Sequence, residues 1–239
     1  LRGLCELCGS CSKDGAVIRA VVFDFDGVIA NSEPLHVSAF QDVLEREGVL
    51  FTEEEYYASY LWYDDIGVFR AVSGARGLPW DRDRIAGLVK RKAERLEALE
   101  HERPLLFPGA EAAIARLAGG LPLAIASGAL RAEILRVLEG ANLARFFRAV
   151  VAAEDTRASK PAPDPYLRAV TLLEASIGQP LSPGECVAIE DSRWGLDSAQ
   201  AAGLRTIAVT HTYPASSLGA VDLIVDTLDA LTVATVCRI

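Results

Sequence analysis

Carboxylates, a hydroxyl and a lysine follow short apolar runs of this sequence, each close to the point where a run ends. The first run, 20-AVVF-23, is followed by Asp24 and Asp26 and then by Gly27. Residues two apart in a strand face the same side, so the two aspartates are expected to lie together while Phe25 turns away. Adjacent carboxylates repel each other unless a cation or a proton lies between them. The pair is therefore either a pair of turn residues or a cation-binding, chemically active site.

Later runs end in groups that would complement such a pair. They are Ser127 with Gly128, Lys160 within 159-SKPAPDP-165, and the acidic residues Glu190 and Asp191. Each has a simple structural interpretation when taken alone. Ser127 would cap a helix, a loop lysine is usually solvated, and acids favour the first turn of a helix. Alternatively, the amide groups after Ser127 would hold an anion.

Their common position favours the chemical interpretation. In an open parallel sheet, ligands bind at the carboxyl ends of the strands, so all these groups would meet at one edge. Carboxylates are hard ligands for Mg²⁺, one carboxylate can act as a nucleophile, and a hydroxyl and an ammonium can hold phosphate oxygens. The set predicts phosphoryl transfer on a small phosphorylated substrate with Mg²⁺ as cofactor.

The elements that position these groups follow from hydrophobic patterning. Short apolar runs alternate with helix-like segments, which predicts an α/β fold with a Rossmann-like, mostly parallel sheet flanked by helices. The runs are 20-AVVF-23, 121-LPLAIA-126, 149-AVVAA-153, 186-CVAI-189, 205-RTIAV-209 and 221-VDLIV-225.

The long segment between the first two runs is predicted to be helical. Apolar residues share one helical face in 35–49 and again in 81–102, Thr52 with Glu55 is a candidate capping box, and 107-FPG-109 is a turn. We therefore expect three parts. They are an N-terminal tail at 1–15, a catalytic core from 16–32 and 107–239, and a helical cap at 33–106.

Composition excludes several classes of protein. The chain has 239 residues, 51% of them apolar, a net charge of −9, and no apolar run long enough to span a bilayer. A nucleic-acid partner would favour a basic stripe, so the net negative charge leads us to expect no nucleic acid as a partner. Because no apolar run is long enough to span a bilayer, we also expect no membrane as a partner. Without the apolar region of a secretory signal, a cytoplasmic protein is the default, and we expect a monomer or weak homodimer.

Three of the five cysteines, Cys5, Cys8 and Cys11, are crowded near the start of the sequence. The spacing resembles part of a zinc or iron–sulfur site, but such a site needs a fourth ligand and none is evident. A loose tail is the simpler interpretation.

With these features, the sequence resembles the haloacid dehalogenase superfamily. The resemblance is to the branch of phosphatases and phosphomutases that have a helical cap after the first strand. The resemblance covers about residues 20 to 210. It rests on the combination of 24-DFDGV-28, Ser127, 159-SKPAPDP-165 and 190-EDS-192, in this order. Related members are β-phosphoglucomutase, sugar-phosphate phosphatases and phosphoglycolate phosphatase.

The resemblance implies roles for these residues. Asp24 would attack phosphorus to form an aspartyl-phosphate, and Asp26 would protonate the leaving oxygen and then activate water. The carboxylates of Asp24 and Asp191 and the main-chain carbonyl of Asp26 would hold Mg²⁺, with Glu190 as a nearby or direct ligand. Ser127 and Lys160 would bind the transferring phosphoryl group, with Gly27 and Gly128 beside the substrate. Dehalogenases of the superfamily lack the second aspartate, so Asp26 favours phosphate chemistry.

Resemblance to the mutase is partial. His36 lies where the mutase has a histidine that assists its acid/base aspartate, and Ser32 also fits; the alternative for His36 is a packing or surface residue of a cap helix. The mutase grips a second phosphate with a cap arginine and a lysine, whereas this chain has Asp64 with Asp65 and Leu130 at those places. Arg131 is a candidate for a second anionic group, although an arginine in a first helical turn is often surface. Hydrolysis is therefore favoured over mutase transfer.

Cap residues are candidates to face substrate hydroxyls, or are ordinary surface residues. They are Glu33, Trp62, Asp64 and Asp65.

Two other classes of protein fit the sequence less well. A receiver domain also combines an acidic Mg²⁺ site, a phosphorylated aspartate, a hydroxyl and a lysine, but it is about half this length and lacks the helical insert. A catalytically idle binding module finds no support, because every acid, hydroxyl and lysine position is filled.

Overall fold

The computed structural model describes residues 17–61, 63–102 and 105–239. They form two compact units, of which the first runs to Asn31 and resumes at Leu106, and the second is Ser32–Leu105. The tail predicted at 1–15, the cysteines in it and Trp62 lie outside the described residues. Within the described part of the chain, no helix has both the length and the apolar character needed to cross a bilayer.

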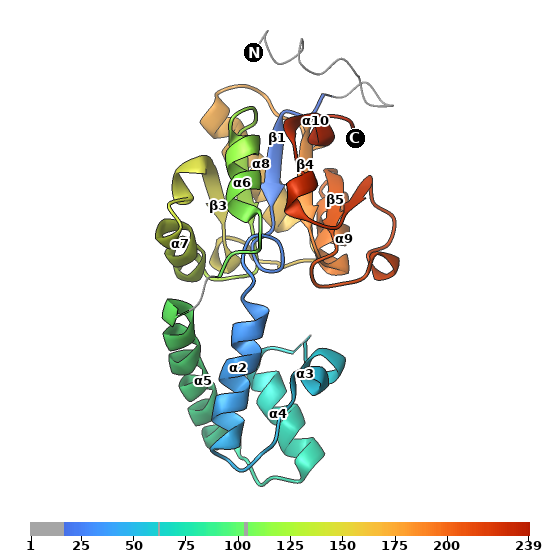
Figure 1. The fold of residues 1–239 in the computed structure, drawn as a ribbon. Coiled ribbons are helices and arrows are strands. Elements are labelled where there is room, and N and C mark those ends of the chain that lie inside the picture. Colours follow the sequence, from blue (N-terminus) through green and yellow to red (C-terminus); the bar gives the residue numbers. More distant parts are fainter. Residues whose placement is uncertain (1–16, 62, 103–104) are drawn as a thin grey trace. The chain divides into compact units, whose positions relative to one another are not determined.

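A six-stranded parallel sheet forms the centre of the first unit, which confirms the predicted fold class (Figure 1). The strand order is β3-β2-β1-β4-β5-β6. The strands are β1 (Ala20–Phe23), β2 (Leu123–Ala126), β3 (Phe147–Val151), β4 (Cys186–Glu190), β5 (Arg205–Val209) and β6 (Leu223–Val225). Each predicted run overlaps one strand. β1 pairs with both β2 and β4, so the segment after it lies at the centre of the sheet edge.

Helices cover both faces of this sheet. They are α6 (Ala110–Ala118), α7 (Arg131–Gly140), α8 (Asp164–Ile177), α9 (Arg193–Ala201) and the short α10 (Val233–Val236). Alternation along β1 separates the faces, because Val21 and Phe23 pack with residues of α6 and α7 while Ala20 and Val22 pack with residues of α8 and α9. The side of the sheet against α8 is rich in alanine, which leaves room for the ring of Tyr166.

The second unit is helical. Its helices are α2 (Glu33–Glu45), α3 (Glu53–Ser59), α4 (Asp65–Arg76) and α5 (Arg82–Glu102). Phe40 lies at the centre of its core, with ring centroids of Tyr56 and Phe69 at 5.8 and 5.3 Å. Thr52 caps α3, since its hydroxyl accepts the amide hydrogen of Glu55, as the capping motif predicts. The first helix ends before the predicted residue 49, because Gly48 adopts a positive φ of 72° in the following turn.

A tight turn follows β1. The amide of Gly27 donates to the carbonyl of Ala30, and the amides of Ile29 and Ala30 both donate to the carbonyl of Phe25. Ala30 then forms an antiparallel bridge with Leu106, where the chain re-enters the first unit. The turn carrying Asp26 and Gly27 is therefore tied both to itself and to the returning segment.

Candidate active site

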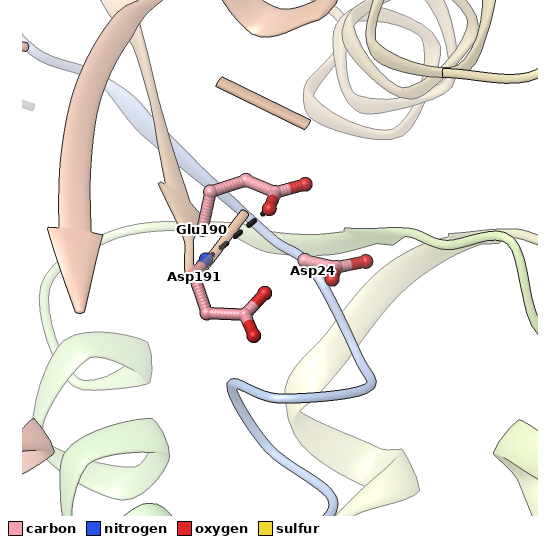
Figure 2. A group of neighbouring side chains, drawn as sticks. All are labelled: Asp24, Glu190 and Asp191. Carbon is pink, nitrogen blue, oxygen red and sulfur yellow. Dashed lines mark hydrogen bonds between the residues drawn. The ribbon is translucent and has the colours of Figure 1, made fainter. Parts of the chain in front are cut away.

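Three carboxylates meet where β1 and β4 end. Asp24, Glu190 and Asp191 each offer an oxygen within 4.8 Å of the others, and Figure 2 shows the three side chains at the ends of the two neighbouring strands. All three are buried, and Glu190 is 0% exposed. The parallel pairing of β1 with β4 brings them together, since Phe23 lies opposite Ile189. The sequence predicts that these residues lie at one edge of the sheet, and in the structure they do lie there.

Lys160 supplies the positive charge beside these acids. Its Nζ donates to Oδ1 of Asp24 at 2.7 Å and to Oε1 of Glu190 at 2.6 Å. The ammonium also lies 5.1 Å from the ring centroid of Tyr166. The loop before α8 therefore delivers a lysine directly to the acid that is predicted to be the nucleophile.

Glu190 is held on both of its oxygens. Oε1 accepts from Lys160 and from the hydroxyl of Tyr166 at 2.9 Å. Oε2 accepts from the Ser192 hydroxyl at 3.0 Å and from the amides of Asp191 and Ser192. A Cβ atom at Gly195 would lie 1.9 Å from Oε1, so the helix after β4 packs directly on the carboxylate. Such a carboxylate orients Lys160.

The electrostatics of the site favour a cation. Burial, Glu190 and Asp191 raise the pKa of Asp24, while Lys160 acts in the opposite direction. Burial and Glu190 raise the pKa of Asp191 to about 7. Burial would lower the pKa of Lys160, but the charges of Asp24 and Glu190 raise it, so the lysine stays cationic. Lys160 pairs with two of the three buried carboxylates, and this excess of hard oxygen donors fits Mg²⁺.

Gly27 is required by the geometry of the site. Its φ is +79°, and a Cβ atom at this position would lie 1.9 Å from Oδ2 of Asp191. Any side chain would therefore collide with that carboxylate. Asp26 precedes this glycine, is partly buried, and bridges to Ala30 through the backbone.

Ser127 directly follows β2 and is buried. Its hydroxyl oxygen accepts the amide hydrogen of Ala129 at 3.0 Å, and the exposed Gly128 between them would leave a Cβ atom in open space. The interpretation of Ser127 as a helix cap is wrong, because α7 begins at Arg131 and its first turn is closed by the Glu133 carboxylate. Its role in binding a phosphoryl group stays a prediction.

Arg131 forms hydrogen bonds and an ion pair with nearby residues. Its guanidinium donates to the carbonyl of Val150 at 3.0 Å and pairs with Asp155, and its amide donates to Glu154. To bind a second anionic group, the guanidinium would have to compete with these partners. That role stays a prediction.

A separate polar cluster lies inside the helical unit. Lys92 is 1% exposed, and its Nζ lies 2.9 Å from Nδ1 of His36, 2.8 Å from Oδ1 of Asp65 and 4.8 Å from the centroid of the Phe40 ring. Burial and the ammonium of Lys92 lower the pKa of His36 to about 3, so this histidine is neutral at physiological pH. Because an ammonium can only donate, Nδ1 of His36 accepts.

The other acidic candidates of the helical unit have structural partners. Asp64 caps α4 by accepting the amide hydrogen of Gly67, and Glu33 accepts a short hydrogen bond from the hydroxyl of Tyr56. Asp65 is paired with Lys92. Their predicted contact with substrate hydroxyls stays untested.

Sequence reasoning missed several polar residues of these clusters. Lys92 lies in register with the apolar stripe of α5, between Val89 and Leu96, and this periodicity was a usable signal. Tyr166 lies on the buried face of α8 and was indistinguishable from an ordinary core residue. His211 and Thr212 follow β5, so polar residues after the run 205-RTIAV-209 were a usable signal, and the side chain of Thr212 lies beside Asp191.

Comparison with known proteins matches this architecture. The family described as haloacid dehalogenase-like hydrolase matches residues 21–209. CbbY of Rhodobacter capsulatus is 32% identical over 82% of this chain and 87% of its own length. Hexitol phosphatase A of Escherichia coli is 31% identical over 90% of this chain and 94% of its own.

A solved structure agrees with these relatives. A mutant CbbY from Rhodobacter sphaeroides in complex with xylulose-(1,5)bisphosphate superposes with a TM-score of 0.68 at 27% identity, covering 88% of this chain and 95% of that one. The family match, the two relatives above 30% identity and the shared fold therefore agree with one another. The chain belongs to the haloacid dehalogenase-like hydrolase family, in its branch of phosphatases.

Proposed function

We propose that this protein is a Mg²⁺-dependent phosphatase that hydrolyses a small phosphorylated metabolite, a sugar phosphate or sugar bisphosphate, through an aspartyl-phosphate at Asp24. The observation that carries the proposal is the contact between Asp24, Lys160 and the acidic pair at the end of β4. The substrate class is supported by the names of the relatives, a hexitol phosphatase and a CbbY crystallised with a sugar bisphosphate.

Asp24 is suited to be the nucleophile. It lies at the end of the central strand, and the ammonium of Lys160 beside it would hold a phosphoryl oxygen during attack. A carboxylate oxygen of Asp24 forms a bond to phosphorus while the bond from phosphorus to the ester oxygen breaks. Asp26 gives its proton to that leaving oxygen, which departs as the sugar hydroxyl.

The second half of the reaction restores the enzyme. Asp26, now a carboxylate, takes a proton from water, and the resulting hydroxide oxygen bonds to phosphorus. The bond from phosphorus to Asp24 breaks, which releases inorganic phosphate and returns the Asp24 carboxylate. Mg²⁺, held by the carboxylates of Asp24 and Asp191 and the carbonyl of Asp26, would offset the negative charge that these acids and the phosphoryl group bring together.

A kinetic screen tests this proposal. Purified protein with Mg²⁺ is assayed on sugar mono- and bisphosphates, phosphoglycolate and glucose 1-phosphate, and released phosphate and isomer formation are followed together. We expect phosphate release from at least one sugar phosphate and its loss in Asp24→Asn. Asp197→Asn is the matched control, because Asp197 lies on α9 in an exposed pair with Arg193.

Two outcomes would overturn the proposal. Absence of turnover across the panel with folded wild-type protein would reject the phosphatase. Isomer formation without net phosphate release would establish a phosphomutase of the β-phosphoglucomutase type instead.

A further inference from the structure

His211 contacts the turn that carries the acid/base aspartate. It follows β5 by two positions, and its Nδ1 lies 3.0 Å from the carbonyl oxygen of Gly27, although the two residues are 184 positions apart. Its ring is half-buried and stacks on Phe107 with a centroid distance of 4.1 Å and an interplanar angle of 20°. A hydrogen bond and a stacked ring therefore fix the imidazole in one orientation.

The direction of this hydrogen bond follows from its acceptor. A carbonyl oxygen can only accept, so Nδ1 of His211 carries the hydrogen and donates it to Gly27. Burial lowers the pKa of His211, so the donor is a neutral imidazole at physiological pH. No change of charge is needed for the contact.

With this bond, both sides of Gly27 are held. Its amide donates to the carbonyl of Ala30 at 2.9 Å, and its carbonyl accepts from His211. Gly27 itself has no side chain that could anchor it and adopts a φ of +79°. The two peptide units on either side of the Gly27 Cα are therefore both held, the one after Asp26 by an intra-turn bond and the next by a bond from a distant loop.

The same loop also reaches the opposite side of the site. The side chain of Thr212 lies beside Asp191, which is predicted to hold the metal. Phe107, under the ring of His211, donates its amide hydrogen to the carbonyl of Ile29 in the turn. The loop after β5 thus contacts the turn directly, through Phe107 and through Asp191.

We propose that His211 is a positioning residue for Asp26, acting through its hydrogen bond to the carbonyl of Gly27. This inference rests on the proposed function, in which Asp26 gives a proton to the leaving oxygen. Loss of the bond lets the turn relax and moves the carboxyl group of Asp26 away from that oxygen. Nothing in the arrangement brings His211 itself into the reaction.

Two substitutions separate the hydrogen bond from the stacked ring. His211→Phe keeps an aromatic ring against Phe107 and removes the donor. His211→Asn keeps a donor at the place of Nδ1 and removes the ring. Ser217→Ala is the control, because Ser217 is exposed in the same loop and its hydroxyl bonds only locally, to the carbonyl of Pro214.

The choice of leaving group provides a readout that a non-specific loss of enzyme activity would not reproduce. A sugar alkoxide needs a proton to depart, whereas p-nitrophenolate leaves as a stable anion. In His211→Phe we expect kcat for a sugar phosphate to fall by about tenfold or more with KM changed by less than about twofold, and kcat for p-nitrophenyl phosphate to fall by less than about threefold. His211→Asn should stay within about threefold of wild type on both substrates.

Hydrogen exchange gives a second readout that does not depend on turnover. We expect the amides of the turn, residues 27–30, to exchange faster in His211→Phe than in wild type, His211→Asn or Ser217→Ala. Equal losses on both substrates, or unchanged exchange in His211→Phe, would overturn the inference even in an active phosphatase. If the wild type releases no phosphate but residues 27–30 still exchange faster in His211→Phe than in wild type, the proposed function is rejected, while the contact that positions the turn is established.

Discussion

Nζ of Lys160 lies 2.7 Å from Oδ1 of Asp24, and both side chains are almost fully withdrawn from solvent, with exposed fractions of 9% and 11%. The pair joins the loop before α8 to the end of β1, across 136 positions of the chain. Because Lys160 also bonds to Glu190, one ammonium serves two buried carboxylates. Removing the ammonium should therefore affect stability as well as catalysis.

Replacing Lys160 by methionine tests whether the ammonium of Lys160 contributes to both stability and catalysis. The substitution preserves most of the volume but leaves Asp24 and Glu190 without their cation. We expect loss of measurable phosphate release and a fall in the free energy of unfolding by about 3–5 kcal/mol in EDTA near neutral pH. Urea denaturation measures the latter. Lys90→Met is the control, because Lys90 is 79% exposed, and equal stability of the two variants would contradict the argument.

Tyr166→Phe tests how Glu190 is held. The hydroxyl of Tyr166 donates to Oε1 of Glu190, and the ring is fully buried. Removing the hydroxyl should cost about 1–3 kcal/mol of unfolding free energy, because it deletes a buried hydrogen bond to a charged acceptor. We expect a modest fall in kcat as well, since Glu190 orients Lys160. The exposed Tyr57 is the comparison site, and a Tyr166→Phe variant no less stable than Tyr57→Phe would count against this role.

Metal removal tests the acidic cluster. EDTA should abolish phosphate release, and added Mg²⁺ should restore it. Mg²⁺ should also raise the melting temperature of the wild type, since an ion that binds the folded state stabilises it. In Asp191→Asn this increase should be lost or strongly reduced. An unchanged melting response in Asp191→Asn, measured by differential scanning fluorimetry, would show that Mg²⁺ binds elsewhere.

The His36 and Lys92 pair predicts a pH dependence of stability. The pKa of His36 falls from 6.5 to about 3 on folding. Between these values the unfolded chain binds a proton that the folded chain does not, so stability is fully present above pH 6.5 and is lost as the pH falls. Relative to His36→Gln, the wild type should lose up to about 1.4 kcal/mol per pH unit below that point.

Chemical denaturation of both proteins from pH 7 to pH 5 measures the difference. Comparison with His36→Gln removes the contributions of the other titrating groups, which the two proteins share. A difference in unfolding free energy that does not change with pH would show that His36 titrates as an exposed histidine does.

Much of the fold and part of the site followed from local pattern. The run 20-AVVF-23 coincides with β1, and the other predicted runs overlap their strands with ends displaced by a few residues, as for 149–153 against Phe147–Val151. Apolar side chains at strand and helix spacing report burial directly, because covalent geometry sets which positions share a face. For the same reason, the polar residues at the ends of these runs were correctly expected at one sheet edge.

Contacts between distant segments were not predictable in this way. The structure shows that Ser127 does not cap α7, that Arg131 pairs with Asp155, and that Lys92 is buried against His36. Each of these residues has a polar side chain whose hydrogen-bond partner is determined by how distant segments pack together. The sequence pattern around a polar residue is the same whether its side chain faces water or a buried partner.

The sequence by itself determined the order of strands along the chain, the helical segment after the first strand, and the candidates Asp24, Asp26, Lys160 and Asp191. These properties depend on side-chain type and on spacing between near neighbours. The tertiary structure decided that Glu190 holds Lys160, that Tyr166 completes this contact and that His211 donates to Gly27. Such contacts depend on the order of strands in the sheet, which places the loops after β1, β4 and β5 side by side.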